Sequence, residues 1–223
     1  MCRLTVEETD LFISTDKTVD RDYCADRVGF YRRRIQSYIS RDERFLTSLK
    51  PVIVERTACA LIRDMSAAAR KADVGPMAAV AGAIAQSLGR DLLKLGCKDV
   101  IVENGGDIFL QSRKSVLIGV FAGSSKFTGR LRLRVDPDSM PCGICTSSAT
   151  VGHSLSFGNA DAVVISSRSA ALADAVATAV CNRVLTKNDF PSAIRFARSI
   201  RGVTGALIIL KNDLASWGRI LLA

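Results

Sequence analysis

Asp174 and Thr178 form the most metal-like pair of residues in this sequence. They lie four positions apart in the segment 173–178, which reads ADAVAT. On a helix this spacing puts both side chains on one face. A carboxylate and a hydroxyl, completed by water and phosphate oxygens, suit Mg²⁺. An aspartate turned inward on such an apolar helix is costly without a cation or hydrogen-bond donors. The alternative is that Asp174 faces water.

A second segment with chemical potential is the glycine turn at 104–107. Asn104, Gly105, Gly106 and Asp107 stand between two predicted strands. Glycine lets a ligand approach the backbone closely, so the turn could bind a cofactor. The same residues are also typical of an ordinary hairpin turn, and both readings stay open.

A third segment, 145–158, is rich in hydroxyl groups. It carries six of them, Thr146, Ser147 and Ser148 included, together with His153, the one histidine of the chain. Hydroxyls and backbone amides can bind phosphate, and a histidine exchanges protons near neutral pH. A structural histidine with satisfied hydrogen bonds is the alternative.

The spacing of Cys142 and Cys145 gives a C-x-x-C motif. A redox pair of the thioredoxin type should open a helix in a β-α-β unit, which the pattern does not predict here. Zinc would need further ligands, and no second cysteine pair or histidine cluster exists in the sequence. We interpret the motif as coincidental. The seven cysteines then indicate reduced thiols, several of them core residues.

Composition narrows the class of protein. The 223 residues carry 31 basic and 22 acidic side chains, so the net charge is 31 − 22 = +9, which favours anionic partners. No run of about 18 apolar residues predicts a membrane span, and the first residues do not resemble a signal peptide. No linker divides the chain. We therefore expect a single domain over 1–223, in the cytoplasm.

Arginines cluster on one face of a helix predicted over 20–40. Arg27, Arg32, Arg33 and Arg34 lie opposite its apolar positions. Such a face could contact nucleic acid or phosphate, but it is more often a solvated surface. The chain offers few aromatic residues to stack on bases and no recognisable nucleic-acid module, so we do not expect nucleic acid as a partner.

The elements that must position these residues mix helices with hairpin-connected strands. This order predicts an α+β fold rather than a repeating β-α-β fold. Besides the helix at 20–40, we predict helices over 56–72, 76–96, 169–184 and 189–200, and strands over 10–14, 99–103, 108–111, 116–121, 129–135, 161–166, 203–210 and 215–221.

Several of these segments together resemble the ApbE superfamily of FAD:protein FMN transferases. The phrases that carry the resemblance are VGPMAAVAG at 74–82, VENGGD at 102–107, CTSS at 145–148 with VGHS at 151–154, and ADAVAT at 173–178. The resemblance is greatest to a short, functionally uncharacterised branch of the superfamily, where it covers nearly the whole chain. To the transferases themselves it covers roughly residues 70 to 185.

This resemblance implies a T-fold-like α+β fold, with helices packed on an antiparallel sheet. The transferases bind FAD and Mg²⁺, cleave the pyrophosphate and attach FMN to a threonine of a target protein. By resemblance, Asp174 and Thr178 bind the metal, and His153 and Asp174 are catalytic. The residues assigned to the cofactor are Gly75, Asn104, Gly105, Gly106, Asp107, Thr146, Ser147 and Ser148.

The sequence also departs from the transferase pattern. Ala79 and Val80 replace a lysine and a glycine, and the FAD-binding segment near the N-terminus is not recognisable. We therefore predict a Mg²⁺-dependent protein that binds a flavin or another phosphorylated nucleotide, with FMN-transferase or FAD-cleaving chemistry. The alternative is a nucleotide- or flavin-binding module without turnover. Related sheets often associate, which is consistent with a homodimer.

Overall fold

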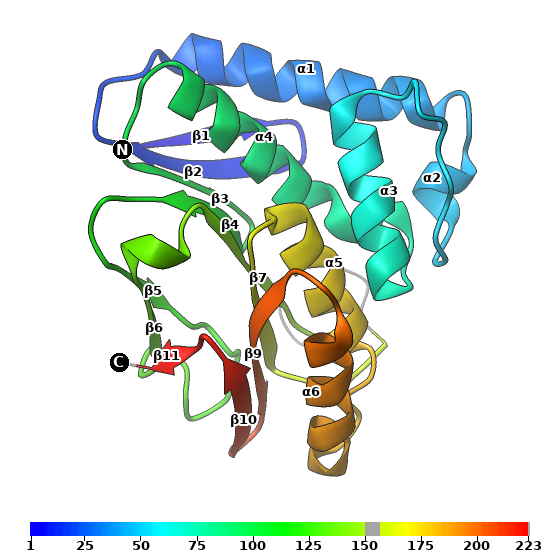
Figure 1. The fold of residues 1–223 in the computed structure, drawn as a ribbon, viewed down its shortest axis with the longest axis vertical. Helices are drawn as coiled ribbons and strands as arrows, with labels where there is room; N and C mark the ends of the chain where they lie inside the picture. The colour runs from blue at the N-terminus through cyan, green and yellow to red at the C-terminus, as the bar shows by residue number, and fades with distance from the viewer. Residues whose placement is uncertain (150–156, 223) are drawn as a thin grey trace.

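The computed structural model, which describes residues 1–149 and 157–222, is built on an eight-stranded sheet (Figure 1). Its strand order is β1-β2-β3-β4-β7-β8-β9-β10, and all neighbouring strands are antiparallel. The strands are β1 (Cys2–Val6), β2 (Thr9–Thr15), β3 (Val100–Asn104), β4 (Asp107–Gln111), β7 (Cys142–Ser147), β8 (Ala162–Ser167), β9 (Val203–Leu210) and β10 (Asp213–Gly218).

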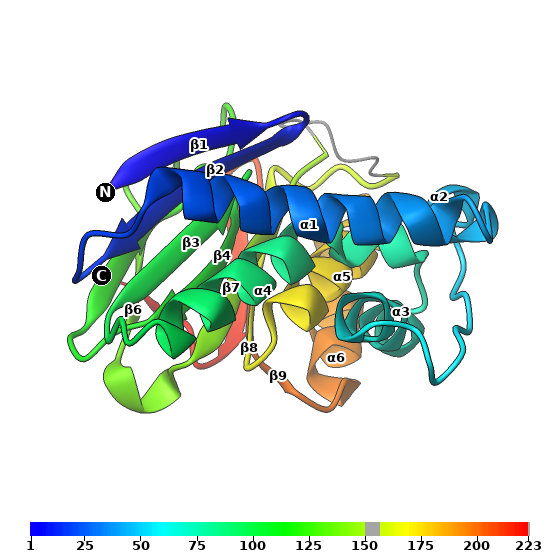
Figure 2. The same cartoon turned by 90° about the horizontal axis from the view of Figure 1, so that it is seen from above.

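The helices cover one face of this sheet (Figure 2). They are α1 (Arg21–Ile39), α2 (Arg44–Thr47), α3 (Ala60–Ala72), α4 (Val80–Lys94), α5 (Ala170–Cys181) and α6 (Phe190–Ser199), with short 3₁₀ turns at Pro76–Ala79, Pro137–Ser139 and Lys187–Asp189. Helix α5 packs on α3 and α4 as well as on β7 and β8, so it occupies the centre of this layer. Within the described part of the chain, no helix combines the length and the apolar character needed to cross a membrane.

A smaller sheet lies against the other face. It has the order β11-β6-β5, with β5 (Val116–Gly119), β6 (Arg132–Val135) and β11 (Leu221–Leu222). In β6 the arginines Arg132 and Arg134 are exposed while Leu133 and Val135 are buried, as the alternation in the sequence predicts. One apolar core lies between the large sheet and the helices, and a second one lies between the two sheets.

The structure confirms the α+β prediction, an antiparallel sheet with helices packed on it, and corrects several details. The second predicted helix begins at Ala60 rather than at 56. Strand β1 was not predicted, because its short pattern of Leu4 between polar residues gives little signal. Strand β7 was not predicted either, because Cys142 and Cys145 were interpreted only as a C-x-x-C motif. Cys142 and Cys145 of this strand point to opposite faces of the sheet, which rules out a redox pair between their two thiols.

Close contact between α5 and its neighbours depends on glycine. A Cβ at Gly82 of α4 would lie 2.4 Å from the carbonyl oxygen of Ala170, and one at Gly143 of β7 would lie 2.3 Å from the Ala170 Cα. Both distances fall below any real carbon contact, and both obstacles are backbone atoms that cannot turn away. The N-terminal turn of α5 is therefore held directly against α4 and β7.

Gly143→Ala should consequently destabilise the protein. Because the added methyl group must push α5 off the sheet, we expect a loss of unfolding free energy of roughly 1–3 kcal/mol or more, measured by urea denaturation. Gly119→Ala is the matched control, since a Cβ there meets no atom within 4 Å. Equal stability of the two variants would contradict this account of the packing.

Candidate functional site

Polar side chains lie on the helix side of the sheet where β3 and β7 end and β4 begins. In β3 the buried positions Val100 and Val102 face the helices, and the next position in that alternation is Asn104. Asp107 pairs with Asn104 across the turn and with Cys145 of β7. The residues on the helix side thus change from apolar to polar at one end of the sheet, where Asn104, Asp107, Cys145 and Ser147 meet.

Asp174 reaches this end of the sheet from α5. The helix begins at Ser169, whose side chain accepts a hydrogen bond from Leu172 N–H. One turn further on, Asp174 Oδ2 accepts a hydrogen bond from the backbone N–H of Gly82 at 2.9 Å. The first N–H groups of α4 lack partners within their own helix, so they suit a carboxylate. Asn104 Nδ2 donates to the carbonyl oxygen of Ala81 at 3.1 Å and fixes the same turn to β3.

Asp107 is the least compensated group in this cluster. It is buried, and its Oδ1 has no hydrogen-bond partner among the described residues; the same holds for the Ser147 hydroxyl. Cys145, opposite Asp107, donates its S–H to the carbonyl oxygen of Ala170 at 3.3 Å. A buried carboxylate oxygen without a partner is costly, which points to a ligand or cation in the working protein.

The two carboxyl groups hold their protons unusually strongly. Burial, followed by the charge of Asp174, raises the pKa of Asp107 well above its usual value. Burial raises the pKa of Asp174 from 3.8 to about 7, against the N–H groups of Gly82 and Ala81, which lower it. Two carboxylates in one desolvated site cannot both ionise easily unless a positive charge joins them.

This arrangement fits a divalent cation. The partnerless oxygen of Asp107 and the mutual repulsion with Asp174 would both be relieved by a positive charge, and the half-buried Thr178 lies one helical turn beyond Asp174. In residues 1–149 and 157–222, no three His, Cys, Asp or Glu side chains are grouped to hold a metal by themselves. The protein would therefore supply only part of the coordination, as is usual for Mg²⁺, with water or phosphate completing it.

The structure brings together most of the residues that the sequence predicted. Asn104, Asp107, Ser147 and Asp174 meet at one end of the sheet, joined by the turn Gly105–Gly106. Thr146 and Ser148 lie at the same end, on or next to β7. His153 lies outside the described residues, so its catalytic role stays a prediction.

Gly75 and the cysteines need separate comment. Gly75 is buried against the loop after α2, where a Cβ would lie 1.8 Å from the carbonyl oxygen of Ser48; its role with a cofactor stays a prediction. Sequence reasoning missed Cys145 as part of the site, because it was grouped with Cys142. Cys145 and Ser147 are two positions apart on one strand and so lie on the same face, and this spacing could have identified Cys145. Burial raises the pKa of Cys142 to about 12, so that thiol is not a ready nucleophile.

The fold is that of the ApbE proteins. Over 97% of its length the structure matches the flavin transferase ApbE from Vibrio cholerae, covering 96% of that chain with a TM-score of 0.62 at 13% identity. The ApbE protein of Thermotoga maritima gives a TM-score of 0.63 at 13% identity, covering 96% of this chain and 95% of that one. At this identity the likeness establishes the fold.

Sequence comparison identifies the family. The chain belongs to the family described as "AbpE bacteria", whose model matches residues 1–214. It is 40% identical to a UPF0280 protein of Methanocaldococcus jannaschii, covering 98% of this chain and 90% of the relative. It is 39% identical to a UPF0280 protein of Methanocella arvoryzae, covering 96% and 87%. These findings confirm the resemblance to the ApbE superfamily and to its short branch.

The raised pKa values predict an unusual dependence of stability on pH. Between about pH 4 and pH 7 the folded, metal-free protein keeps protons on Asp107 and Asp174 that the unfolded chain releases. The unfolding free energy should therefore fall as the pH rises through this window, by on the order of a few kcal/mol. Urea denaturation at a series of pH values measures it, and Asp174→Asn should flatten the slope.

The control for this experiment is Asp26→Asn, which removes an exposed carboxylate of α1. It should keep the slope of the unmodified protein. Groups such as Asp99, whose pKa Arg113 holds down at about 2, lose their contribution at lower pH and do not interfere. An unchanged slope in Asp174→Asn would show that this carboxyl does not titrate as the structure indicates.

Proposed function

We propose that this protein binds a flavin nucleotide together with Mg²⁺ and cleaves the pyrophosphate of FAD, transferring FMN to an acceptor hydroxyl. The observation that carries the proposal is the pair of mutually repelling carboxyls beside a glycine turn, Asp107 buried and Asp174 half-buried. Two structurally similar proteins, the flavin transferase ApbE of Vibrio cholerae and the flavinyl transferase ApbE of Pseudomonas stutzeri, support the choice of ligand. The proposal further includes that FMN is transferred to a target protein, that two copies of the chain form a homodimer, and that the protein is located in the cytoplasm.

In this reaction one phosphorus–oxygen bond replaces another. The oxygen of the acceptor, a threonine hydroxyl or water, bonds to the FMN phosphorus. The bond from that phosphorus to the bridging oxygen breaks, and AMP leaves with the bridging oxygen. The acceptor gives up its proton to a base, for which the resemblance offers His153. A bound Mg²⁺ would neutralise charge on the phosphate oxygens.

The described residues would position the substrate in this scheme. The N–H of Gly82 orients Asp174, so that its second oxygen and the Thr178 hydroxyl would hold the cation from one helix face. Asp107 would approach it from β4, and the turn at Gly105 and Gly106 would leave room for phosphate beside the backbone. A Cβ at Gly105 would meet no atom within 4 Å, so that side of the turn is open.

A binding module without turnover is the second candidate. Ala79 and Val80, which replace the lysine and glycine of the transferases, favour it. The two candidates differ in one result. The enzyme converts FAD into FMN and AMP in the presence of Mg²⁺, whereas the module binds FAD and forms no product over hours. Liquid chromatography of the incubated nucleotide decides between them.

Asp174→Asn should abolish Mg²⁺-dependent nucleotide binding while leaving the fold intact. Asparagine keeps the size and one oxygen of aspartate but loses the charge that attracts a hard cation. It also removes a half-buried group whose ionisation is costly in the metal-free protein, so the melting temperature of the metal-free variant should stay the same or rise. Calorimetry with FAD and ADP, with and without Mg²⁺, measures the effect.

Asp26→Asn is again the matched control and should bind as the unmodified protein does. Thr178→Val should weaken Mg²⁺ binding less than Asp174→Asn, since a neutral ligand is lost. If Asp174→Asn bound Mg²⁺ and nucleotide normally, the metal site would have to lie elsewhere. If the unmodified protein bound none of these nucleotides, the proposed function would be wrong.

A further inference from the structure

The small sheet of β5, β6 and β11 has one face packed on the large sheet and one face exposed to solvent. On β6, Leu133 and Val135 are buried in the core between the two sheets, whereas Arg132 and Arg134 are exposed. Because successive side chains of a strand point to opposite sides, the two arginines lie on the side of the small sheet that faces away from the large sheet. We call this side the outer face.

Basic and apolar side chains lie next to each other on the outer face. Leu117 of β5 pairs with Arg134 of β6, and Arg134 pairs in turn with Leu221 of β11. Two residues earlier on β6, Arg132 pairs with Gly119, which has no side chain. Leu117 is 53% exposed and Leu221 51%, so an arginine of the central strand stands between two leucines that contact solvent.

The pattern continues beyond the ends of β5 and β6. The N–H of Val120 donates to the carbonyl oxygen of Leu131 at 3.0 Å, which keeps the two segments paired after Gly119. The next residues in this register are Phe121 and Arg130, and both are exposed, Phe121 by 60%. The outer face thus carries three arginines at alternate positions of one segment, about 7 Å apart, together with three large apolar side chains.

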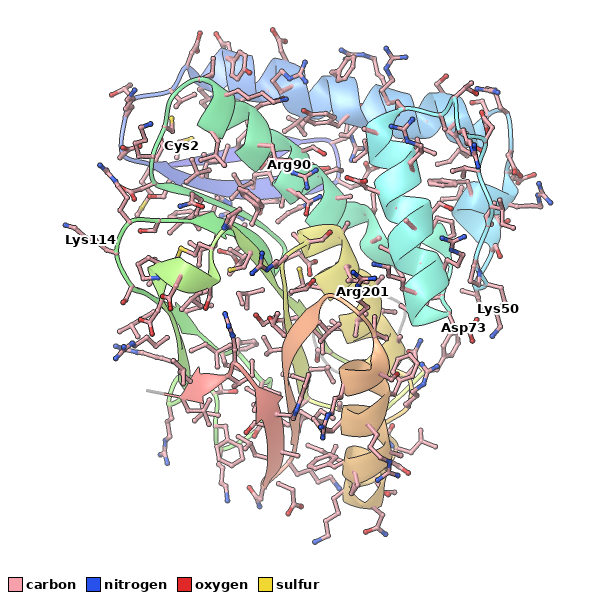
Figure 3. All side chains as sticks on the ribbon, in the orientation of Figure 1. Cys2, Lys50, Asp73, Arg90, Lys114 and Arg201 are labelled. Atoms are coloured by element: carbon pink, nitrogen blue, oxygen red, sulfur yellow. The ribbon has the colours of Figure 1, made fainter. Side chains whose placement is uncertain are left out.

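Acidic side chains neutralise little of this charge. Among the described residues, Arg130 and Arg132 make no ion pair, and Arg134 pairs with Asp136 at 2.9 Å. Lys114, which precedes β5, points away from the molecule beside the same sheet (Figure 3). The outer face is therefore a positively charged surface with guanidinium groups that a partner can reach.

An anionic lipid surface is the partner that this combination fits best. Residues 113–138 carry six basic and two acidic side chains, a net charge of 6 − 2 = +4, which attracts phosphate-bearing headgroups. Guanidinium groups bind phosphate through paired hydrogen bonds. Aliphatic side chains such as Leu117 and Leu221 do not stack on nucleic-acid bases, but they insert between lipid headgroups. Exposed apolar groups gathered beside arginines indicate a binding surface rather than chance exposure.

We propose that the outer face binds the surface of a membrane that contains anionic phospholipids. Arg130 and Arg132 contact headgroup phosphates, while Phe121 and Leu221 enter the boundary between the headgroups and the acyl chains. Such binding is peripheral. It goes beyond the proposed function, because it concerns where the protein works rather than which molecule it converts.

Co-sedimentation with phospholipid vesicles tests the role of the arginines. The probes are vesicles of phosphatidylcholine with phosphatidylglycerol, which is anionic, and vesicles of phosphatidylcholine alone. We expect the unmodified protein to bind the anionic vesicles more tightly and to lose binding as the salt concentration rises. A double variant with Arg130→Gln and Arg132→Gln should bind them roughly tenfold or more weakly, because each arginine near an anionic surface contributes about fivefold.

The matched control removes two exposed arginines from α1, with Arg33→Gln and Arg34→Gln. It lowers the net charge by the same amount, and it should bind the anionic vesicles as the unmodified protein does. Because the arginines removed in both double variants are exposed, the midpoint of urea denaturation should change little in either variant.

Leu221→Ser tests the role of the apolar side chains. Leu221 is chosen because Leu117 and Phe121 also border the cavity between the two sheets, where a substitution would have a second effect. Loss of this exposed leucine should weaken binding to the anionic vesicles by roughly threefold or more. Ile53→Ser is the control, since Ile53 is 83% exposed and lies far along the chain from the small sheet, in the loop before α3.

Each outcome decides for or against the membrane surface. The proposal is overturned if the unmodified protein does not bind anionic vesicles, or if the α1 double variant binds them as weakly as the β6 double variant, which would show attraction by net charge alone. Binding to a single-stranded oligonucleotide or to polyglutamate, without binding to vesicles, overturns it as well. Mg²⁺-dependent binding of FAD, measured by calorimetry, should be the same in both double variants, so failure of this inference leaves the proposed function standing.

Discussion

The constraint on which this structure depends is the presence of two carboxyl groups near each other, Asp107 buried and Asp174 half-buried. Each is desolvated, and each makes ionisation of the other more costly. A protein that needed only stability would place apolar residues there, because a buried ionic group is rarely the most stable choice. Keeping them requires donors from the α4 terminus at Gly82, and it leaves one Asp107 oxygen without a partner among the described residues.

The small residues around α5 follow from this constraint. Asp174 can reach the Gly82 N–H only if α4 and α5 approach to backbone contact, and the missing Cβ of Gly82 allows it. Gly143 does the same where α5 meets β7. Gln86 adds a polar tie, accepting a hydrogen bond from the Ala170 N–H at 2.8 Å. The small side chains of the alanine-rich helix α5 thus help to position Asp174 as well as to fill the core.

Sequence patterns predicted the parts of the fold that depend on local periodicity. The helix at 20–40 and the strands beside 104–107 repeat their apolar residues clearly, and both were found with small shifts at the ends. Strand β7 was not predicted, because its two cysteines were interpreted as a C-x-x-C motif and the alternation of its residues was not considered. Asp174 was recognised as a candidate from its apolar surroundings, yet its partner N–H on α4, 92 positions away, follows only from tertiary packing.

The position of the carboxylate cluster at the strand ends also shows how one sheet separates two environments. Successive residues of a strand face opposite sides, so a single turn presents Asp107 to the helix layer and Gly106 and Thr146 to the cavity between the sheets. On the helix side Asp107 is buried beside a large apolar core, whereas the side toward the small sheet carries a second, mostly aliphatic core. The turn between these two environments requires its glycines, since Gly105 and Gly106 both adopt positive φ, which other residues reach only with strain.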